Sequence, residues 1–134
     1  MRGETIPAKD LTKLTRAENF DDYSGVKLVD ESKARGTAVD AVAGGNWIKF
    51  ADAQLGGGVS TFTASAAKAG GGDGAIQIRL DSPTGPLVGT ARVTSTGSVY
   101  TYAPTSTSIR GASGRHDVYL VFASGLRLVT FTLT

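Results

Sequence analysis

The chain has 134 residues, of which 14 are basic and 12 acidic, and its formal net charge is +2. This length provides for one hydrophobic core, so we expect residues 1–134 to form a single domain. The near balance of charge, without a basic run interleaved with aromatic residues, argues against nucleic acid as a partner. The absence of cysteine excludes disulfides, thiolate metal sites and cysteine nucleophiles.

The sequence contains no apolar run of membrane-spanning length, so we expect no membrane partner. The segment Met1–Glu4 lacks the features of a signal peptide, and none is expected in this chain. The 18 glycines, together with abundant serine and threonine, favour short strands joined by tight turns.

The first part of the chain predicts short, irregular strands. Thr5–Ala8 and Leu11–Leu14 are typical of strand fragments, and Val26–Val29 is a brief strand. A charged loop is expected over Asp30–Gly36. Thr37–Val42 fits either a strand or a short helix, because its pattern does not separate the two.

The middle of the chain gives clearer patterns. Asn46–Phe50 alternates between polar and apolar residues and carries Trp47, and Val59–Ala67 is a longer strand. Ile76, Ile78 and Leu80 alternate with polar residues, and the turn-forming segment DSPTGP precedes a second extended stretch. We therefore predict a β-hairpin over Ala75–Val93.

The last third continues the series of strands. Extended segments are expected at Val99–Tyr102 and Thr105–Ile109, with a break at Pro104, and a turn at Gly111–Gly114. Strands at His116–Phe122 and Leu126–Thr134 complete the chain. Roughly nine or ten short strands without an amphipathic helix predict an all-β fold, an antiparallel β-sandwich of the jelly-roll type.

The sequence supplies little for catalysis, so we predict that the protein is not an enzyme. His116 is the only histidine and is interpreted as a structural strand residue, since it has no partners for a triad or a metal cluster. The acidic pairs Asp21-Asp22 and Asp30-Glu31 are adjacent in sequence. A glycosidase needs two acids that face each other across a cleft, which adjacent residues do not indicate.

Sugar recognition needs an aromatic ring for the apolar face of the sugar and polar groups for its hydroxyls. Trp47 is the best single candidate, although it could equally pack between the sheets. Tyr23, Tyr100, Tyr102 and Tyr119 are weaker candidates, each interpreted first as a packing residue.

Four blocks of sequence together resemble the family 6 carbohydrate-binding modules of plant-polysaccharide hydrolases. They are ENFDDYSGV at 18–26, GNWIKF at 45–50, IQIRLDSPTGPLVG at 76–89 and GRHDVYLVF at 114–122. The resemblance implies a non-catalytic β-sandwich, secreted as part of a larger hydrolase. It also implies a polysaccharide or oligosaccharide ligand of the xylan, cellulose or β-glucan class, and we expect a monomer.

The family's usual sugar cleft, at one end of the sandwich, is expected to be altered here. Its Tyr, Trp and Asn positions fall on Ala41, Val99 and Val129. Losing two stacking rings would cost about 2–4 kcal/mol of binding free energy. The resemblance therefore indicates an engineered or strongly diverged member, with a cleft that is disabled or adapted to a non-sugar small molecule.

A second sugar site occurs in some family members, on the concave face of a sheet. Trp47 matches the tryptophan of that site, and Gln77 and Arg79 share one side of the hairpin strand. We therefore predict Trp47, Gln77 and Arg79 as the carbohydrate-binding residues.

The family also carries a structural calcium held by two glutamates near the N-terminus. The corresponding segment here is Pro7-Ala8-Lys9, in which both glutamates are lost. Calcium needs several hard oxygen ligands. We therefore expect no cofactor and no metal at this position.

Overall fold

A computed structural model describes residues 9–11, 15–17, 20–32, 35–41, 44–55, 58–68, 74–98, 102–122 and 126–134, without the side chains of 9–10 and 30–37. Twelve strands lie in these ranges. They are β1 (Lys9–Asp10), β2 (Thr15–Arg16), β3 (Asp22–Ser24), β4 (Lys27–Ser32), β5 (Arg35–Ala41), β6 (Trp47–Gln54), β7 (Val59–Ala67), β8 (Gly74–Leu80), β9 (Leu87–Val93), β10 (Ala103–Ala112), β11 (Arg115–Phe122) and β12 (Leu126–Leu133).

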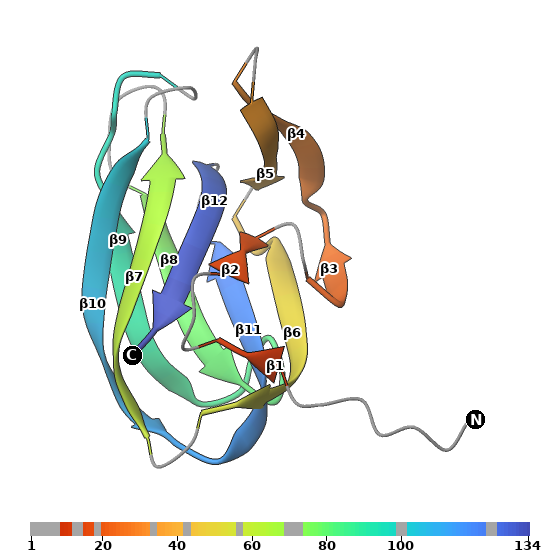
Figure 1. Cartoon of the computed structure of the whole chain (residues 1–134), viewed down its shortest axis with the longest axis vertical. Coiled ribbons are helices and arrows are strands. Elements are labelled where there is room, and N and C mark those ends of the chain that lie inside the picture. Colours follow the sequence, from red (N-terminus) through yellow and green to blue (C-terminus); the bar gives the residue numbers. More distant parts are fainter. Residues whose placement is uncertain are drawn as a thin grey trace.

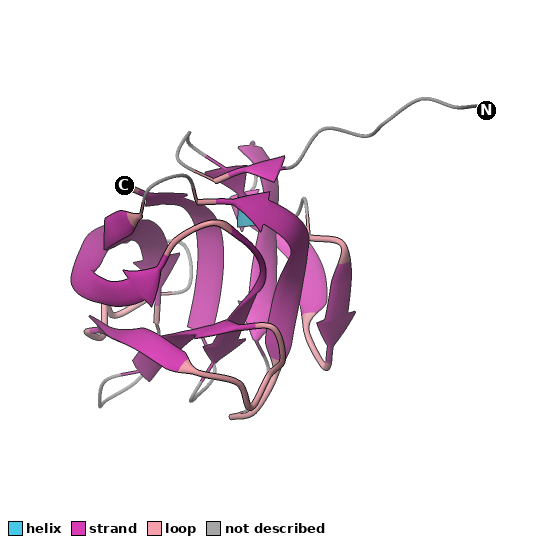
Figure 2. Ribbon diagram, turned by 90° about the horizontal axis from the view of Figure 1, so that it is seen from below, coloured by secondary structure: helices cyan, strands magenta, loops and turns pink. Residues whose placement is uncertain are grey.

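The strands form two sheets packed face to face (Figures 1 and 2). The first sheet has the order β1-β6-β11-β8-β9, with β3 also paired to β6. The second has the order β10-β7-β12-β5-β4, with β2 paired to β12. All pairs are antiparallel except β1–β6. The predicted β-sandwich is confirmed. Within the ambiguous segment Thr37–Val42, residues 37–41 belong to strand β5, and Val42 lies outside the described residues. The described residues include no helix of the length and hydropathy needed to cross a membrane.

Both sheets contribute one face to a continuous apolar core. Phe131 of β12 lies at its centre, 5.0 Å from the Phe50 ring of β6 and 5.9 Å from the Phe62 ring of β7, measured between centroids. All three rings are fully buried. Because Phe50 belongs to the first sheet and the other two to the second, this cluster joins the two layers.

The predicted loop over Asp30–Gly36 is wrong. β4 continues to Ser32 and β5 begins at Arg35, and these two residues pair across a tight hairpin. Strand pairing here depends on backbone hydrogen bonds. Since β4 is an edge strand, charged side chains are compatible with it and even protect the edge.

The predicted break at Pro104 is also wrong, because Pro104 lies inside β10, opposite Ser65. β10 is the edge strand of the second sheet, where the missing N–H of proline can face solvent. The strand also extends past the expected turn residue Gly111, which takes a φ of 75° next to a shift in register. The predicted segments Thr5–Ala8 and Val99–Tyr102 lie outside the described residues, apart from Tyr102.

We expect Phe131→Ala to lower the free energy of unfolding by about 3–5 kcal/mol, since it removes the ring that contacts both sheets. The measurement is urea-induced unfolding followed by fluorescence. Thr132→Ala, next to it on β12 but on the outer side, should change the free energy by less than about 0.5 kcal/mol. Equal effects of the two substitutions would contradict the central position of Phe131.

Candidate functional site

The β8–β9 hairpin is present as predicted, and it directs two polar side chains outward. Ile76, Ile78 and Leu80 are buried in the core, whereas Gln77 and Arg79 lie on the opposite side of β8 and are half-buried. Across the sheet, Gln77 pairs with Val121 and Arg79 with Tyr119 of β11. The sequence prediction that Gln77 and Arg79 share one side of the strand is therefore confirmed.

Strand β6 places two further side chains on the same surface. Ile48 and Phe50 point into the core, so Trp47 and Lys49 point away from it. Trp47 pairs with Val121, and Lys49 pairs with Tyr119. We call this surface the outer face of the first sheet. It carries two rows of side chains, Trp47–Val121–Gln77 and Lys49–Tyr119–Arg79.

Trp47 is therefore not a core residue between the sheets. Its ring is half-buried and meets the Tyr119 ring edge to face, with centroids 5.1 Å apart. Tyr119 is only 7% exposed. Tyr119 thus contacts the Trp47 ring from the side, and Trp47 as a residue remains partly exposed.

Lys49 is held beside Tyr119 by two interactions. Its Nζ lies 5.7 Å from the centroid of the Tyr119 ring and 3.6 Å from Oδ2 of Asp117. The contact with Tyr119, and to a smaller extent the charge of Asp117, raises the pKa of Lys49 above its ordinary value of 10.5. Lys49 therefore stays protonated at neutral pH.

Arg79 is fixed by two neutral oxygen atoms. Its Nε donates to Oε1 of Gln77 at 3.2 Å, and its Nη1 donates to the carbonyl oxygen of Gly85 at 2.8 Å. A guanidinium has five N–H donors, so these bonds leave others available. Within the described chain, Arg79 forms no ion pair with a carboxylate.

The hairpin loop depends on a glycine that also orients Arg79. A Cβ added to Gly85 would lie 2.0 Å from the carbonyl oxygen of Leu80, far inside van der Waals contact. The loop is closed by a hydrogen bond from the Leu80 amide to Pro86 and begins with Asp81 at a φ of 71°. Only glycine fits this path, and its carbonyl then faces Arg79.

The charged residues at the start of β11 are engaged in structural contacts. Nδ1 of His116 lies 3.1 Å from Asp81, which agrees with the structural interpretation of this histidine. Oδ1 of Asp117 accepts the amide of Asp52, which has a φ of 53° at a bulge in β6. Arg115 pairs with Asp52.

The acidic pairs named from the sequence do not form a facing pair across a cleft in the described part. Asp21 accepts the amide of Ala51 and Asp22 that of Tyr23, both at 2.8 Å. The side chains of Asp30 and Glu31 lie outside the described residues. Among the residues that are described, no group of three or more His, Cys, Asp or Glu is placed to hold a metal ion.

Two of the three expected cleft positions are buried in the described structure. Ala41 is 1% exposed and belongs to the core, where it pairs with Leu126. Val129 is 5% exposed and lies at the register shift between Leu128 and Thr130. Val99 lies outside the described residues.

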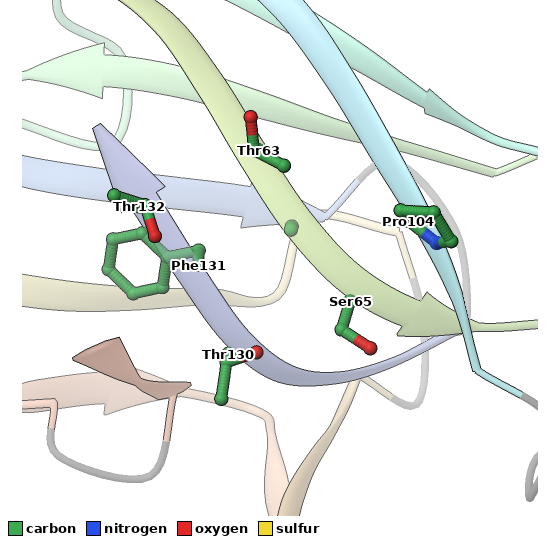
Figure 3. Close-up of a pocket in the computed structure, with 7 residues that line it drawn as sticks. Thr63, Ser65, Pro104, Thr130, Phe131 and Thr132 are labelled. Carbon is green, nitrogen blue, oxygen red and sulfur yellow. The ribbon is translucent and has the colours of Figure 1, made fainter. Parts of the chain in front are cut away.

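A shallow depression of about 210 Å³ lies on the second sheet, away from the Trp47 surface (Figure 3). It is lined by side chains of β7, β10 and β12, namely Thr63, Ala64, Ser65, Pro104, Thr130, Phe131 and Thr132. The exposed lining of the depression is mostly apolar, and because Phe131 is fully buried it offers no accessible ring. Neither Ala41 nor Val129 lines it.

The sequence profile of the carbohydrate binding module family 6 matches residues 16–134, nearly the whole chain. The chain belongs to this family. It is 34% identical over 124 residues to endo-1,4-beta-xylanase A of Thermoclostridium stercorarium, a match that covers 92% of this chain and 24% of the xylanase. An arabinoxylan arabinofuranohydrolase of Paenibacillus polymyxa is 45% identical over 85 residues, covering 63% and 13%. The module thus spans less than a quarter of the length of these two relatives.

Solved family 6 modules have the same fold. A module of Clostridium stercorarium in complex with cellobiose superimposes with a TM-score of 0.88 at 27% identity, covering 97% of this chain and 98% of that one. A Clostridium cellulolyticum module in complex with xylose gives 0.87 at 35% identity, covering 94% and 99%. These matches confirm the family and the fold predicted from the sequence.

The sequence analysis does not single out Lys49, which the structure of this family 6 module places on the outer face beside Tyr119. Its place one residue beyond Ile48 in an alternating strand is the signal that puts it on the same side as Trp47. The burial of Tyr119 agrees with its interpretation as a packing residue. Its partner Trp47 could not be inferred, because strand pairing between β6 and β11 is not visible in the sequence.

Replacing Gly85 by alanine should lower the free energy of unfolding of the module by about 1–3 kcal/mol, since the Cβ would collide with the Leu80 carbonyl. Chemical denaturation measures this change. Thr84→Ala in the same exposed loop serves as the control and should have little effect. A Gly85→Ala protein as stable as the native one would show that the loop tolerates a side chain here.

Proposed function

We propose that this family 6 module is a non-catalytic binding domain that holds a plant polysaccharide on the outer face of the first sheet. The ligand class is xylan, cellulose or β-glucan. The observation that carries the proposal is the partly exposed Trp47, whose ring contacts Tyr119 and which lies on the same face as Gln77 and Arg79.

The chemistry of this face suits a sugar ring. The apolar side of a pyranose packs on an aromatic ring, and its hydroxyls need donors and acceptors at the rim. Gln77 offers amide groups and Arg79 offers unused N–H donors, two strands away from Trp47. Val121 lies between them and provides an apolar floor.

The relatives support a sugar ligand by their own complexes. Family 6 modules that share at least 27% identity with this chain were solved with cellobiose and with xylose. Both are constituents of the β-1,4-linked polymers proposed here. The supporting relatives in sequence are bacterial hydrolases, so we propose that the module is a monomeric, extracellular part of such an enzyme.

The loop-end cleft is proposed to be altered in this module. Ala41 and Val129 are small, apolar and buried, so neither supplies an accessible ring or a polar group. A non-sugar ligand bound through these two residues has less support, because the depression found in the second sheet is lined by other side chains.

Trp47→Ala should weaken binding of xylo- or cello-oligosaccharides roughly thirtyfold, a loss of about 2 kcal/mol, because it removes the stacking surface. Isothermal titration calorimetry measures the affinity. Thr63→Ala, on the outer side of the second sheet, is the matched control and should leave the affinity unchanged.

Chemical-shift mapping by NMR locates the site independently of the substitution. Sugar titration should perturb the amides of Gln77, Arg79 and Tyr119. Perturbations confined to Leu126–Thr130, with full affinity in the Trp47→Ala protein, would place the ligand at the loop-end cleft instead.

We further propose that the module binds no calcium at Pro7-Ala8-Lys9, where the family's glutamates are replaced. The side chains of these residues lie outside the described structure, so the proposal rests on the donor chemistry of the sequence. The melting temperature should be the same in calcium and in excess chelator. A marked rise on adding calcium would contradict this proposal.

A further inference from the structure

The outer face of the first sheet carries positive charge on both sides of Tyr119. Lys49 and Arg79 are its direct neighbours on β6 and β8. With strands about 4.8 Å apart, the two residues lie about 10 Å from each other, in the row next to Trp47. A sugar stacked on Trp47 would therefore lie beside both cations.

The nearby carboxylates do not neutralise this surface fully. Asp22 of β3 lies opposite Lys49 and accepts the Tyr23 amide. Asp117 is engaged with Lys49 and with the Asp52 amide, and Asp81 contacts His116. Arg79 contacts only the neutral oxygens of Gln77 and Gly85. The positive charge of Arg79 thus remains uncompensated among the described residues.

We propose that this face selects a glycan that bears a negative charge, either the carboxylate of a uronic acid or a sulfate ester, and that Arg79 contacts the anion. This inference rests on the proposed function, since it assigns a ligand class to the same surface. Arginine presents paired N–H donors that match two oxygens of a carboxylate or sulfate.

Arg79 is better suited to this role than Lys49. The charge of Lys49 is partly compensated by Asp117 at 3.6 Å. Arg79 is held in place by two hydrogen bonds before any ligand arrives, so little conformational entropy is lost on binding. Lys49 adds to the local positive potential from the other side of Tyr119.

The test compares three oligosaccharides with the same β-1,4-xylosyl backbone: neutral, with one glucuronosyl branch, and with one sulfate. Calorimetry at about 0.05 M salt should show about fivefold tighter binding of a charged form than of the neutral one. The advantage should disappear at about 0.5 M salt, where the Debye length is only a few ångströms. The charged oligosaccharide that binds more tightly than the neutral one, glucuronosyl or sulfated, identifies the preferred anion as a carboxylate or a sulfate.

Two substitutions assign the preference to Arg79. Arg79→Gln should make the affinities for charged and neutral forms equal, whereas Arg79→Lys should keep part of the difference. Arg110→Gln removes the same charge from the exposed side of β10 on the other sheet and should keep the full preference. Melting curves show whether each variant is folded. If the Arg79→Gln protein is not folded, the affinity of the Arg79→Lys protein and the salt dependence of the native module decide whether Arg79 contacts the anion.

The possible failures are distinguishable. Equal binding of neutral and charged forms by the native module, abolished by Trp47→Ala, would overturn this inference and leave the proposed function standing. No binding of any form would overturn both. A charge preference that survives Arg79→Gln, or that is lost in Arg110→Gln, would show that Arg79 is not the anion-contacting residue.

Discussion

The packing of Phe131 against Phe50 and Phe62 is the contact on which the rest of the structure depends. It joins the two sheets at the centre of the core and is fully enclosed. Because every strand that contributes to this core must turn its apolar residues inward, the residues between them must face outward. The outer face of the first sheet is a consequence of this constraint.

Strand β11 determines which of the outward-facing side chains lie side by side. It lies between β6 and β8, so its registers with both neighbours decide which side chains meet. A slip of one residue in either pairing would move a whole strand's polar side chains into the core. Trp47 and Arg79 therefore share a surface because the core fixes the registers, although they lie on different, non-adjacent strands.

Two residues beside the outer face serve both the fold and the arrangement of its charged side chains. Gly85 is required by the tight path of the β8–β9 loop, and its carbonyl fixes Arg79. Asp117 supports the bulge at Asp52 and also balances the charge of Lys49. Asp117 and Asp81 are engaged in contacts within the fold, so neither carboxylate pairs with Arg79. The positive charge of Arg79 on the outer face is the result.

The sequence by itself determined the family, through the resemblance of four blocks of residues. It also determined the β-sandwich, the hairpin at 75–93 and the shared side of Gln77 and Arg79, because these depend on local alternation and turn residues. The predictions of a loop over Asp30–Gly36 and of a break at Pro104 were wrong. The edge strands β4 and β10 tolerate charged side chains and a proline, respectively. It left Trp47 undecided between core and surface.

Only the tertiary structure decided that Trp47 faces outward, that Tyr119 supports it, and that Lys49 joins the same surface. It also showed that Ala41 and Val129 are buried. The reason is that pairing between distant strands, and the burial that results from it, is set by long-range contacts that no local pattern of residues contains.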